Sequence, residues 1–193
     1  VKEFEHAGVS GIHLEDQVWP KRCGHMFGKT LIPKEEMCQK LKAAQDARED
    51  PDFVLIARCD AMLVNGLDDV LERCDAYVEA GADMLFCEVR DSMDEVKAVA
   101  DHFKGRVPLH WNHSPSPMVP RMSAKEVEAL GFKTCCFYVQ SLMAAAKTMQ
   151  EVLAEIRKSG TSEGIADRMI GFDELWEIND MASIREMEKK YAT

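Results

Sequence analysis

The fold class is decided by residues 53–88, FVLIARCDAMLVNGLDDVLERCDAYVEAGADMLFCE. Phe53–Arg58 (FVLIAR) and Asp83–Glu88 (DMLFCE) are short, almost entirely apolar runs of strand length. Between them, Leu67–Ala80 carries apolar residues at helical spacing and is followed by Gly81, a common helix stop. A strand–helix–strand unit of this kind is typical of two parallel strands covered by a helix.

The same alternation continues on both sides of this segment. Strands are expected at Gly11–Glu15, Val107–Asn112 and Lys133–Tyr138. Helices are expected at Pro33–Asp50, Ser92–Phe103, Ser123–Leu130 and Ser141–Lys158, and Ser92-x-x-Glu95 and Ser123-x-x-Glu126 are capping boxes. Five successive βα units predict an α/β fold with a parallel sheet, either open and doubly wound or part of a (β/α)8 barrel. The sequence from Thr161 predicts two or three short helices outside the repeat.

Composition narrows the class of function. The chain has 193 residues, a formal net charge of −10 and 46% apolar residues, which is enough to bury a core. The acidic balance argues against nucleic acid or an anionic membrane surface as a partner. No run approaches the roughly 20 apolar residues that cross a bilayer. There are seven Cys and no C-x-x-C pair, and most of these Cys, Cys23 excepted, lie in apolar runs and are expected to be buried thiols. This usage indicates a reducing compartment, and we expect a cytoplasmic protein, with an organelle such as the mitochondrial matrix as the alternative.

Polar residues follow each predicted strand, where parallel strands present their carboxyl ends to one rim. The groups nearest the strand ends are Glu15, Arg58, Glu88, Asn112 and Tyr138. Carboxylates in such positions suit Mg²⁺, which prefers oxygen ligands. The alternative interpretation is ordinary loop polarity, and we favour a shared site because all five strand ends on this rim are polar.

The connection Asp16–Leu31 exceeds the usual βα loop and contains Lys21-Arg22-Cys23-Gly24-His25. Neighbouring cations stabilise a thiolate, and Gly24 lets the backbone approach a ligand closely. A solvated basic loop with a chance Cys is an equally weighted alternative. A direct hydrogen bond between Cys23 and His25 is not expected for residues two apart in a loop. We expect His6, His13, His102 and His110 to be structural or exposed.

Three stretches carry a resemblance to a known family: Leu14-Glu15-Asp16-Gln17, Lys21–His25, and Ala57-Arg58-Cys59-Asp60-Ala61. Together they resemble the isocitrate lyase/phosphoenolpyruvate mutase superfamily over residues 1–160, and the K-[KR]-C-G-H motif resembles its lyase branch. The resemblance implies a (β/α)8 barrel and a homotetramer in which a C-terminal helix is swapped between subunits. Residues 1–160 would then be strands 4 to 8 of the barrel, and residues 161–193 the exchanged helical segment.

The resemblance also implies a reaction. It is the Mg²⁺-dependent, retro-aldol-type cleavage of a 2-hydroxy di- or tricarboxylate to a 2-oxo acid, pyruvate or glyoxylate, and a carboxylate, with Mn²⁺ as an alternative metal. The proton donor would be Cys23, and the metal would be held through water by Glu15. The gating loop and the anionic intermediate would be ordered by Lys21, Arg22, Gly24 and His25. The substrate would be bound by Arg58, Glu88, Asn112, Ser114 and Ser116.

Departures from the family pattern leave the substrate open. Cys59 stands where Thr is common, Pro115 where shorter members carry Glu, and Ala144 where methylisocitrate lyases place Arg. Methylisocitrate, dimethylmalate and isocitrate lyases therefore all stay candidates. An oxaloacetate hydrolase is a close alternative, and an inactive scaffold or fragment is a further one.

Only five of the eight βα units are expected, and five strands do not close an eight-stranded barrel. The family's metal-binding Asp residues and its Ser-Gly-Gly loop lie on the first three units and are absent from this sequence. Val1 is therefore expected to be a cut point in the helix before the fourth strand.

Overall fold

The computed structural model describes residues 1–89 and 92–192, which form two compact units, Val1–Val139 and Gln140–Thr193. The first unit holds every strand of the described chain. The predicted division at residues 160/161, with an exchanged segment after it, stays a prediction. In the structure, the helix that precedes residue 160 belongs to the same compact unit as the C-terminal residues.

All strands of the first unit run parallel and follow chain order. The strands β1 (Gly11–Glu15), β2 (Val54–Cys59) and β3 (Met84–Cys87) form one sheet, and β4 (His110–Asn112) pairs with β5 (Thr134–Cys136). A parallel bridge between Leu85 and Leu109 links β3 to β4. Each strand thus lies beside the next strand of the sequence, and the carboxyl ends of all five lie at one edge.

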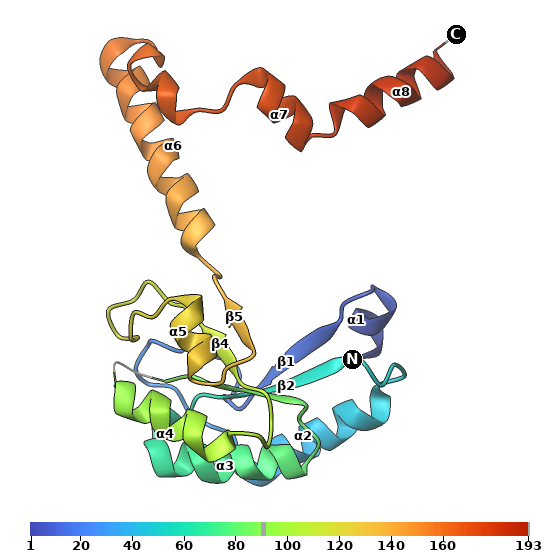
Figure 1. Ribbon diagram of the computed structural model, residues 1–193, viewed down its shortest axis with the longest axis vertical. Helices are drawn as coiled ribbons and strands as arrows, with labels where there is room; N and C mark the ends of the chain where they lie inside the picture. Colours follow the sequence, from blue (N-terminus) through green and yellow to red (C-terminus); the bar gives the residue numbers. More distant parts are fainter. Residues whose placement is uncertain (90–91, 193) are drawn as a thin grey trace. The chain divides into compact units, whose positions relative to one another are not determined.

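Helices cover one face of the three-stranded sheet (Figure 1). Within the first unit the helices are α1 (Lys2–His6), α2 (Lys34–Ala47), the 3-10 turn η1 (Ala61–Leu63), α3 (Leu67–Glu79), α4 (Met93–Phe103) and α5 (Ala124–Ala129). Strand β2 shows the resulting two-sidedness: Leu55, Ala57 and Cys59 are buried, whereas Ile56 and Arg58 point to the other face. That second face carries the polar side chains.

The predicted α/β alternation is confirmed, with differences at the element ends. Ser123 makes the full capping box with Glu126. Ser92 accepts a hydrogen bond from Glu95 N, but the Glu95 side chain does not reach back to Ser92. Only one of the two hydrogen bonds of the predicted capping box is therefore present at α4. Strands β4 and β5 are three residues each, shorter than expected.

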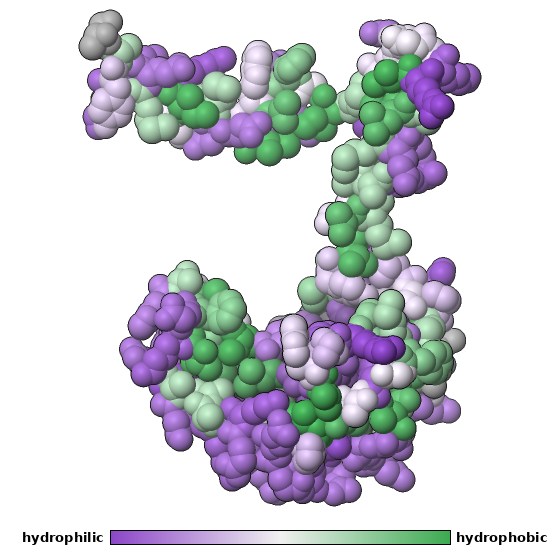
Figure 2. All heavy atoms as spheres, turned by 180° about the vertical axis from the view of Figure 1, so that it is seen from behind, coloured by the Kyte–Doolittle hydropathy of each residue, from purple (hydrophilic) through white to green (hydrophobic). Residues whose placement is uncertain are grey.

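The second unit consists of helices that bury none of their described residues. They are α6 (Gln140–Ser159), the 3-10 segment η2 (Glu163–Arg168), α7 (Phe172–Ile178) and α8 (Met181–Tyr191). Apolar side chains lie on their surface (Figure 2), among them Leu153, 67% exposed, and Phe172, 74% exposed. Among the described residues, no helix has the length and apolar character needed to cross a membrane.

A buried carboxylate joins the sheet to its helical layer. Asp16, fully buried at the end of β1, accepts hydrogen bonds from Tyr77 Oη at 2.8 Å and from Asp60 N at 2.9 Å. Burial raises the pKa of Asp16, and the hydrogen bonds from Asp60, Tyr77 and Cys59 oppose that shift. The Tyr77 hydroxyl therefore links α3 to the strand end on which the polar cluster is built.

We expect Tyr77→Phe to lower the free energy of unfolding by about 1–3 kcal/mol, because it leaves a buried acceptor short of a partner. Urea unfolding of the intact protein measures this loss. Tyr191→Phe is the matched control: Tyr191 is 70% exposed, and its hydroxyl should contribute almost nothing. Equal stability of Tyr77→Phe and wild type would contradict the linking role of this hydroxyl.

Candidate active site

A cavity of about 550 Å³ lies at the carboxyl ends of the five strands. Because side chains alternate along a strand, residues two apart point to the same face. That spacing brings His13 with Glu15, Phe86 with Glu88, and His110 with Asn112 into the lining. The lining residues are His13, Glu15, Lys21, Cys23, Gly24, His25, Arg58, Phe86, Glu88, His110, Asn112, Cys136 and Tyr138.

Arg58 lies at the centre of a carboxylate cluster. Its Nε is 2.7 Å from Asp60 Oδ2 and 3.0 Å from Glu15 Oε1, and its Nη2 is 3.1 Å from Glu88 Oε2. Burial opposes the charge of Arg58, but the hydrogen bond and charge of Asp60 outweigh burial and raise the pKa of the guanidinium. Burial likewise opposes ionisation of Asp60, yet Arg58 holds its pKa well below the usual range. This ion pair is therefore fixed in its charged form.

Two lysines complete the charge balance of the cluster. Lys29 Nζ lies 2.9 Å from Asp60 Oδ1, with its side chain 1% exposed, and Lys21 Nζ lies 3.1 Å from Glu15 Oε2. Three carboxylates thus face three cations: Glu15, Asp60 and Glu88 against Lys21, Lys29 and Arg58. Lys29, Asp60 and Glu88 are almost completely buried, and buried charges are tolerated when they are paired.

The loop that carries Cys23 passes directly over this cluster. A Cβ atom on Gly24 would lie 2.6 Å from Arg58 Nη2 and 2.7 Å from Glu88 Cδ, so any larger residue here would displace the paired side chains of Arg58 and Glu88. A turn, closed by Met26 N donating to Cys23 O at 2.9 Å, folds His25 back toward the preceding residues. Gly24 thus approaches protein side chains closely, while its approach to a ligand stays a prediction.

Cys23 and His25 do contact each other, which corrects the expectation from their spacing. Cys23 Sγ is exposed and lies 3.8 Å from His25 Nδ1, because the turn brings these side chains together. The other ring nitrogen, His25 Nε2, is 3.2 Å from Glu88 Oε1. The three side chains form a line from the exposed thiol to a buried carboxylate.

This line has unused hydrogen-bonding capacity. His25 Nε2 and Glu88 Oε2 are buried and make no well-oriented hydrogen bond with any described residue, although charged neighbours lie close. Burial lowers the pKa of His25, helped by Lys29 and Arg58, and burial raises the pKa of Glu88 against the opposing charge of Arg58. The imidazole is therefore held neutral, and the carboxyl takes up a proton more readily than usual, which suits proton transfer.

Eight of the sequence-predicted residues meet in the cavity; Arg22, Ser114 and Ser116 do not line it. Arg22 Nη1 turns to Phe27 O at 3.5 Å, within the loop. Ser114 is buried, with its Oγ 3.0 Å from Tyr138 Oη, and Ser116 Oγ accepts from Met118 N at 3.2 Å. The substrate-binding roles given to these serines, and to Arg58, stay predictions.

Sequence reasoning missed the aromatic floor of the cavity. The rings of His13, Phe86 and His110 pack edge to face, with centroids 5.1–5.7 Å apart, and Arg58 lies 4.7 Å from the Phe86 ring centre. The two-residue period of a strand could have identified both histidines. His13 precedes the site residue Glu15 by two positions, and His110 precedes Asn112 by two positions. Both rings therefore belong to the site wall.

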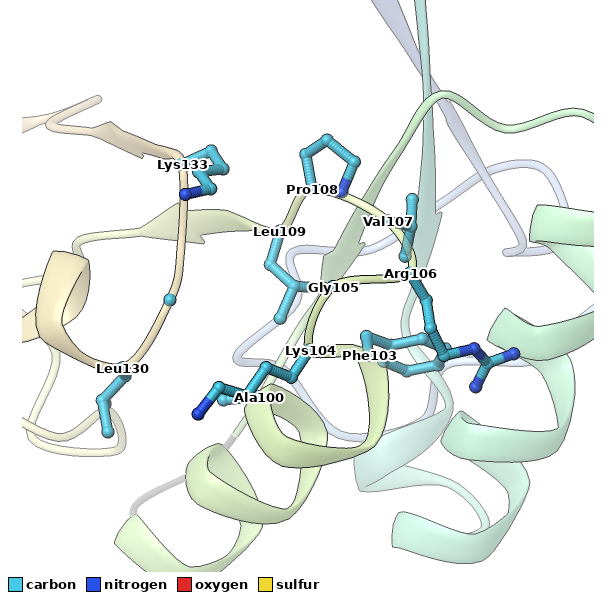
Figure 3. A pocket seen from close by; sticks show the side chains of 11 residues that line it. Ala100, Phe103, Lys104, Gly105, Arg106, Val107, Pro108, Leu109, Leu130 and Lys133 are labelled. Atoms are coloured by element: carbon cyan, nitrogen blue, oxygen red, sulfur yellow. The ribbon is translucent and has the colours of Figure 1, made fainter.

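A second cavity, of about 390 Å³, lies at the opposite ends of the strands, before β4 and β5 (Figure 3). Its walls are mainly apolar, with Leu109 on one side, Leu130 and Lys133 on the segment across from it, and Lys104 extending toward the space between them. In a parallel barrel-type sheet, chemistry belongs to the carboxyl ends. The site with convergent titratable groups is therefore the one around Arg58.

A metal ion requires more ligands than the described residues bring together. No group of three or more His, Cys, Asp or Glu side chains with the spacing of a metal site occurs among them. Glu15 is already held by Lys21 and Arg58. This single carboxylate fits contact with a metal-bound water and does not by itself fit direct chelation.

Comparison with known proteins defines the class. The profile of the phosphoenolpyruvate phosphomutase family matches residues 1–157, and the chain belongs to this family, within the PEP mutase/isocitrate lyase superfamily. The 2,3-dimethylmalate lyase of Eubacterium barkeri is 40% identical over 193 residues, covering 100% of this chain and 66% of that protein. The 2-methylisocitrate lyase of Escherichia coli is 38% identical over 177 residues, covering 92% and 59%.

Solved structures agree with this assignment. A 2,3-dimethylmalate lyase superposes with a TM-score of 0.88 at 28% identity, over 99% of this chain and 63% of that one. An oxaloacetate acetylhydrolase with the inhibitor 3,3-difluorooxalacetate gives 0.89 at 29% identity, over 98% and 63%. The chain thus has the superfamily's α/β fold and spans less than two thirds of the length of these relatives.

The floor of the site generates a prediction about pH. Burial lowers the pKa of His110 from 6.5 to about 4, with His13 and Arg58 adding to the shift. Between these values the unfolded chain binds more protons than the folded one, so stability falls as the pH is lowered through this window. We expect the His110 ring to stay neutral down to about pH 4 in an NMR titration.

Replacement of the ring checks the linkage. His110→Gln should show a flatter dependence of unfolding free energy on pH across this window. Thr134→Val is the control, since it removes the hydroxyl 2.8 Å from His110 Nδ1 and leaves the burial that causes the shift. A wild-type ring that titrates near 6.5 would be incompatible with the structure.

Proposed function

We propose that this chain carries most of the active site of a Mg²⁺-dependent carbon–carbon lyase acting on a 2-hydroxy di- or tricarboxylate. The observation that carries the proposal is the line Cys23–His25–Glu88 beside the Arg58 cluster. An exposed thiol, a neutral imidazole and a buried carboxyl in contact form a route for one proton. The lyases to which the chain is similar support the reaction class.

The proposed fold is a sector of a (β/α)8 barrel with five of its eight βα units. Sequential order of the parallel strands and helices on one face favour this arrangement over a doubly wound sheet, whose helices cover both faces. Three further strands would close such a barrel between β5 and β1.

The proposed step is a retro-aldol cleavage. The bond between the carbinol carbon and the neighbouring carbon breaks as the substrate hydroxyl releases its proton to a water molecule and becomes the oxo group. The electron pair stays on the departing carboxylate as an enolate-like carbanion. Cys23 transfers its thiol proton to that carbon. The thiolate recovers a proton through His25, which takes one from the Glu88 carboxyl at Nε2 as it gives one up at Nδ1, and solvent then reprotonates Glu88.

Mg²⁺, or Mn²⁺, would polarise the oxygen that becomes the oxo group and neutralise its charge. Glu15 would hold this ion through a water molecule, and the direct ligands would come from outside the residues described. A similar protein, a phosphonopyruvate hydrolase, has a structure with oxalate and Mg²⁺. The partner we propose is therefore a small anionic carboxylate.

A second candidate function is hydrolysis of oxaloacetate to oxalate and acetate. The close superposition on oxaloacetate acetylhydrolase favours it as the alternative, because the same cavity would then admit an attacking water. We also propose a homotetramer with exchange of helices, since α6, α7 and α8 expose apolar side chains such as Leu153 and Trp176.

The test is an assay of the intact protein with Mg²⁺ against methylisocitrate, dimethylmalate, isocitrate and oxaloacetate. Formation of a 2-oxo acid identifies the lyase, and oxalate with acetate identifies the hydrolase. Absence of product from all four substrates would refute both enzyme proposals.

On the active substrate, Cys23→Ser should lower kcat by roughly 10²–10⁴-fold, the usual loss on removing a general acid. Circular dichroism and the urea midpoint should stay at wild-type values, because Cys23 is exposed. Cys38→Ser, on α2 and away from the cavity, is the control and should keep full activity. Near-normal turnover of Cys23→Ser would rule out its role in proton transfer.

A further inference from the structure

The loop that carries Cys23 is attached to the strand ends at the two residues that flank this thiol. Gln17 Nε2 donates to Arg22 O at 2.9 Å, and Arg22 N donates to Gln17 Oε1 at 2.9 Å. On the other side, Lys29 Nζ donates to Gly24 O at 2.6 Å. Cys23 thus lies between two residues whose backbone groups are bound by buried side chains.

Gln17 is anchored before it contacts the loop. Its residue is 7% exposed, and its backbone forms an antiparallel bridge with Leu31, at the far end of the same connection. Its Nε2 also donates to Glu15 Oε1 at 2.9 Å. The amide therefore uses its acceptor and both donors at once, and its orientation is fixed by Glu15.

Lys29 is anchored through a buried ion pair. Its ammonium, 2.9 Å from Asp60 Oδ1, is almost completely removed from solvent. A buried ammonium is costly unless all its neighbours are well placed, and the carbonyl of Gly24 supplies a second acceptor. The position of this carbonyl is therefore tied to Asp60.

Both attachments lead back to the same guanidinium. Glu15, which orients Gln17, and Asp60, which pairs with Lys29, each contact Nε of Arg58, at 3.0 and 2.7 Å. A movement of Arg58 toward a bound anion would change its contacts with Glu15 and Asp60. Through these carboxylates it would change the contacts on both sides of Cys23.

We propose that Gln17 and Lys29 are positioning residues that together set the place of Cys23 Sγ and couple the loop to the Arg58 cluster. Neither residue lines the cavity, so neither contacts the reacting atoms. The inference rests on the proposed function, in which Cys23 transfers the proton. It extends that function by naming the side chains that hold the thiol in place.

Hydrogen exchange of the intact protein tests the attachment directly, because Arg22 N donates to the Gln17 side chain. In Gln17→Met the Arg22 amide should exchange about tenfold faster, since both hydrogen bonds to this residue are lost. Tryptic cleavage of the native protein after Lys21 and Arg22 should rise by a similar factor. Where the variant is active, kcat should fall more than KM rises, because the ground-state contacts stay in place.

Gln45→Met is the matched control, because Gln45 also donates its amide to a backbone oxygen, that of Gly81, on the helical side of the unit. It should leave Arg22 exchange and loop cleavage at wild-type values. Unchanged exchange and cleavage in Gln17→Met would overturn the proposal, and so would an equal rise throughout β2, which indicates a structural role only. If the wild-type protein has no lyase or hydrolase activity, the proposed function is refuted. The exchange rates still test whether Gln17 holds the loop in place.

Discussion

The ion pair between Arg58 and Asp60 is the interaction on which the site depends. Asp60 is fully buried, and its two oxygens bind the only two described cations that reach it, Arg58 and Lys29. Arg58 in turn touches Glu15 on β1 and Glu88 after β3. One guanidinium therefore joins three neighbouring strand ends, and removal of its charge would leave three carboxylates facing one another in a poorly hydrated place.

The same pair connects the sheet to the loop. Asp60 N donates to the buried Asp16, and Asp16 O accepts from Ile32 N, where the long connection returns. Lys29 extends the network to Gly24, which fits over Arg58 because it lacks a Cβ. The loop is thus shaped by contacts with charged groups of the sheet as well as by its own sequence, and this explains how a long connection holds a defined position over the cavity.

Local chemistry in the sequence predicts much of this arrangement. Apolar runs and caps predict the βα units, and polar strand ends predict that Glu15, Arg58, Glu88 and Asn112 meet, because parallel strands share one edge. The ion-pair partner of each charged side chain could not be predicted from the sequence. Lys21 was expected to act on the anionic intermediate and Arg58 to bind the substrate, whereas the structure pairs each of them with a carboxylate. The Cys23–His25 contact was also missed, because it depends on a turn that no residue pattern announces.

This pairing bears on how an anionic substrate would be held. With Glu15, Asp60 and Glu88 against Lys21, Lys29 and Arg58, and His25 neutral, the described cluster has no net positive charge to offer a di- or trianion. Under the proposed function, a divalent cation would supply the missing positive charge. Binding of the metal would then strengthen binding of the substrate, and binding of the substrate would strengthen binding of the metal. The raised pKa of Glu88 acts in the same direction, because a proton on that carboxyl frees part of the charge of Arg58 for the incoming carboxylate.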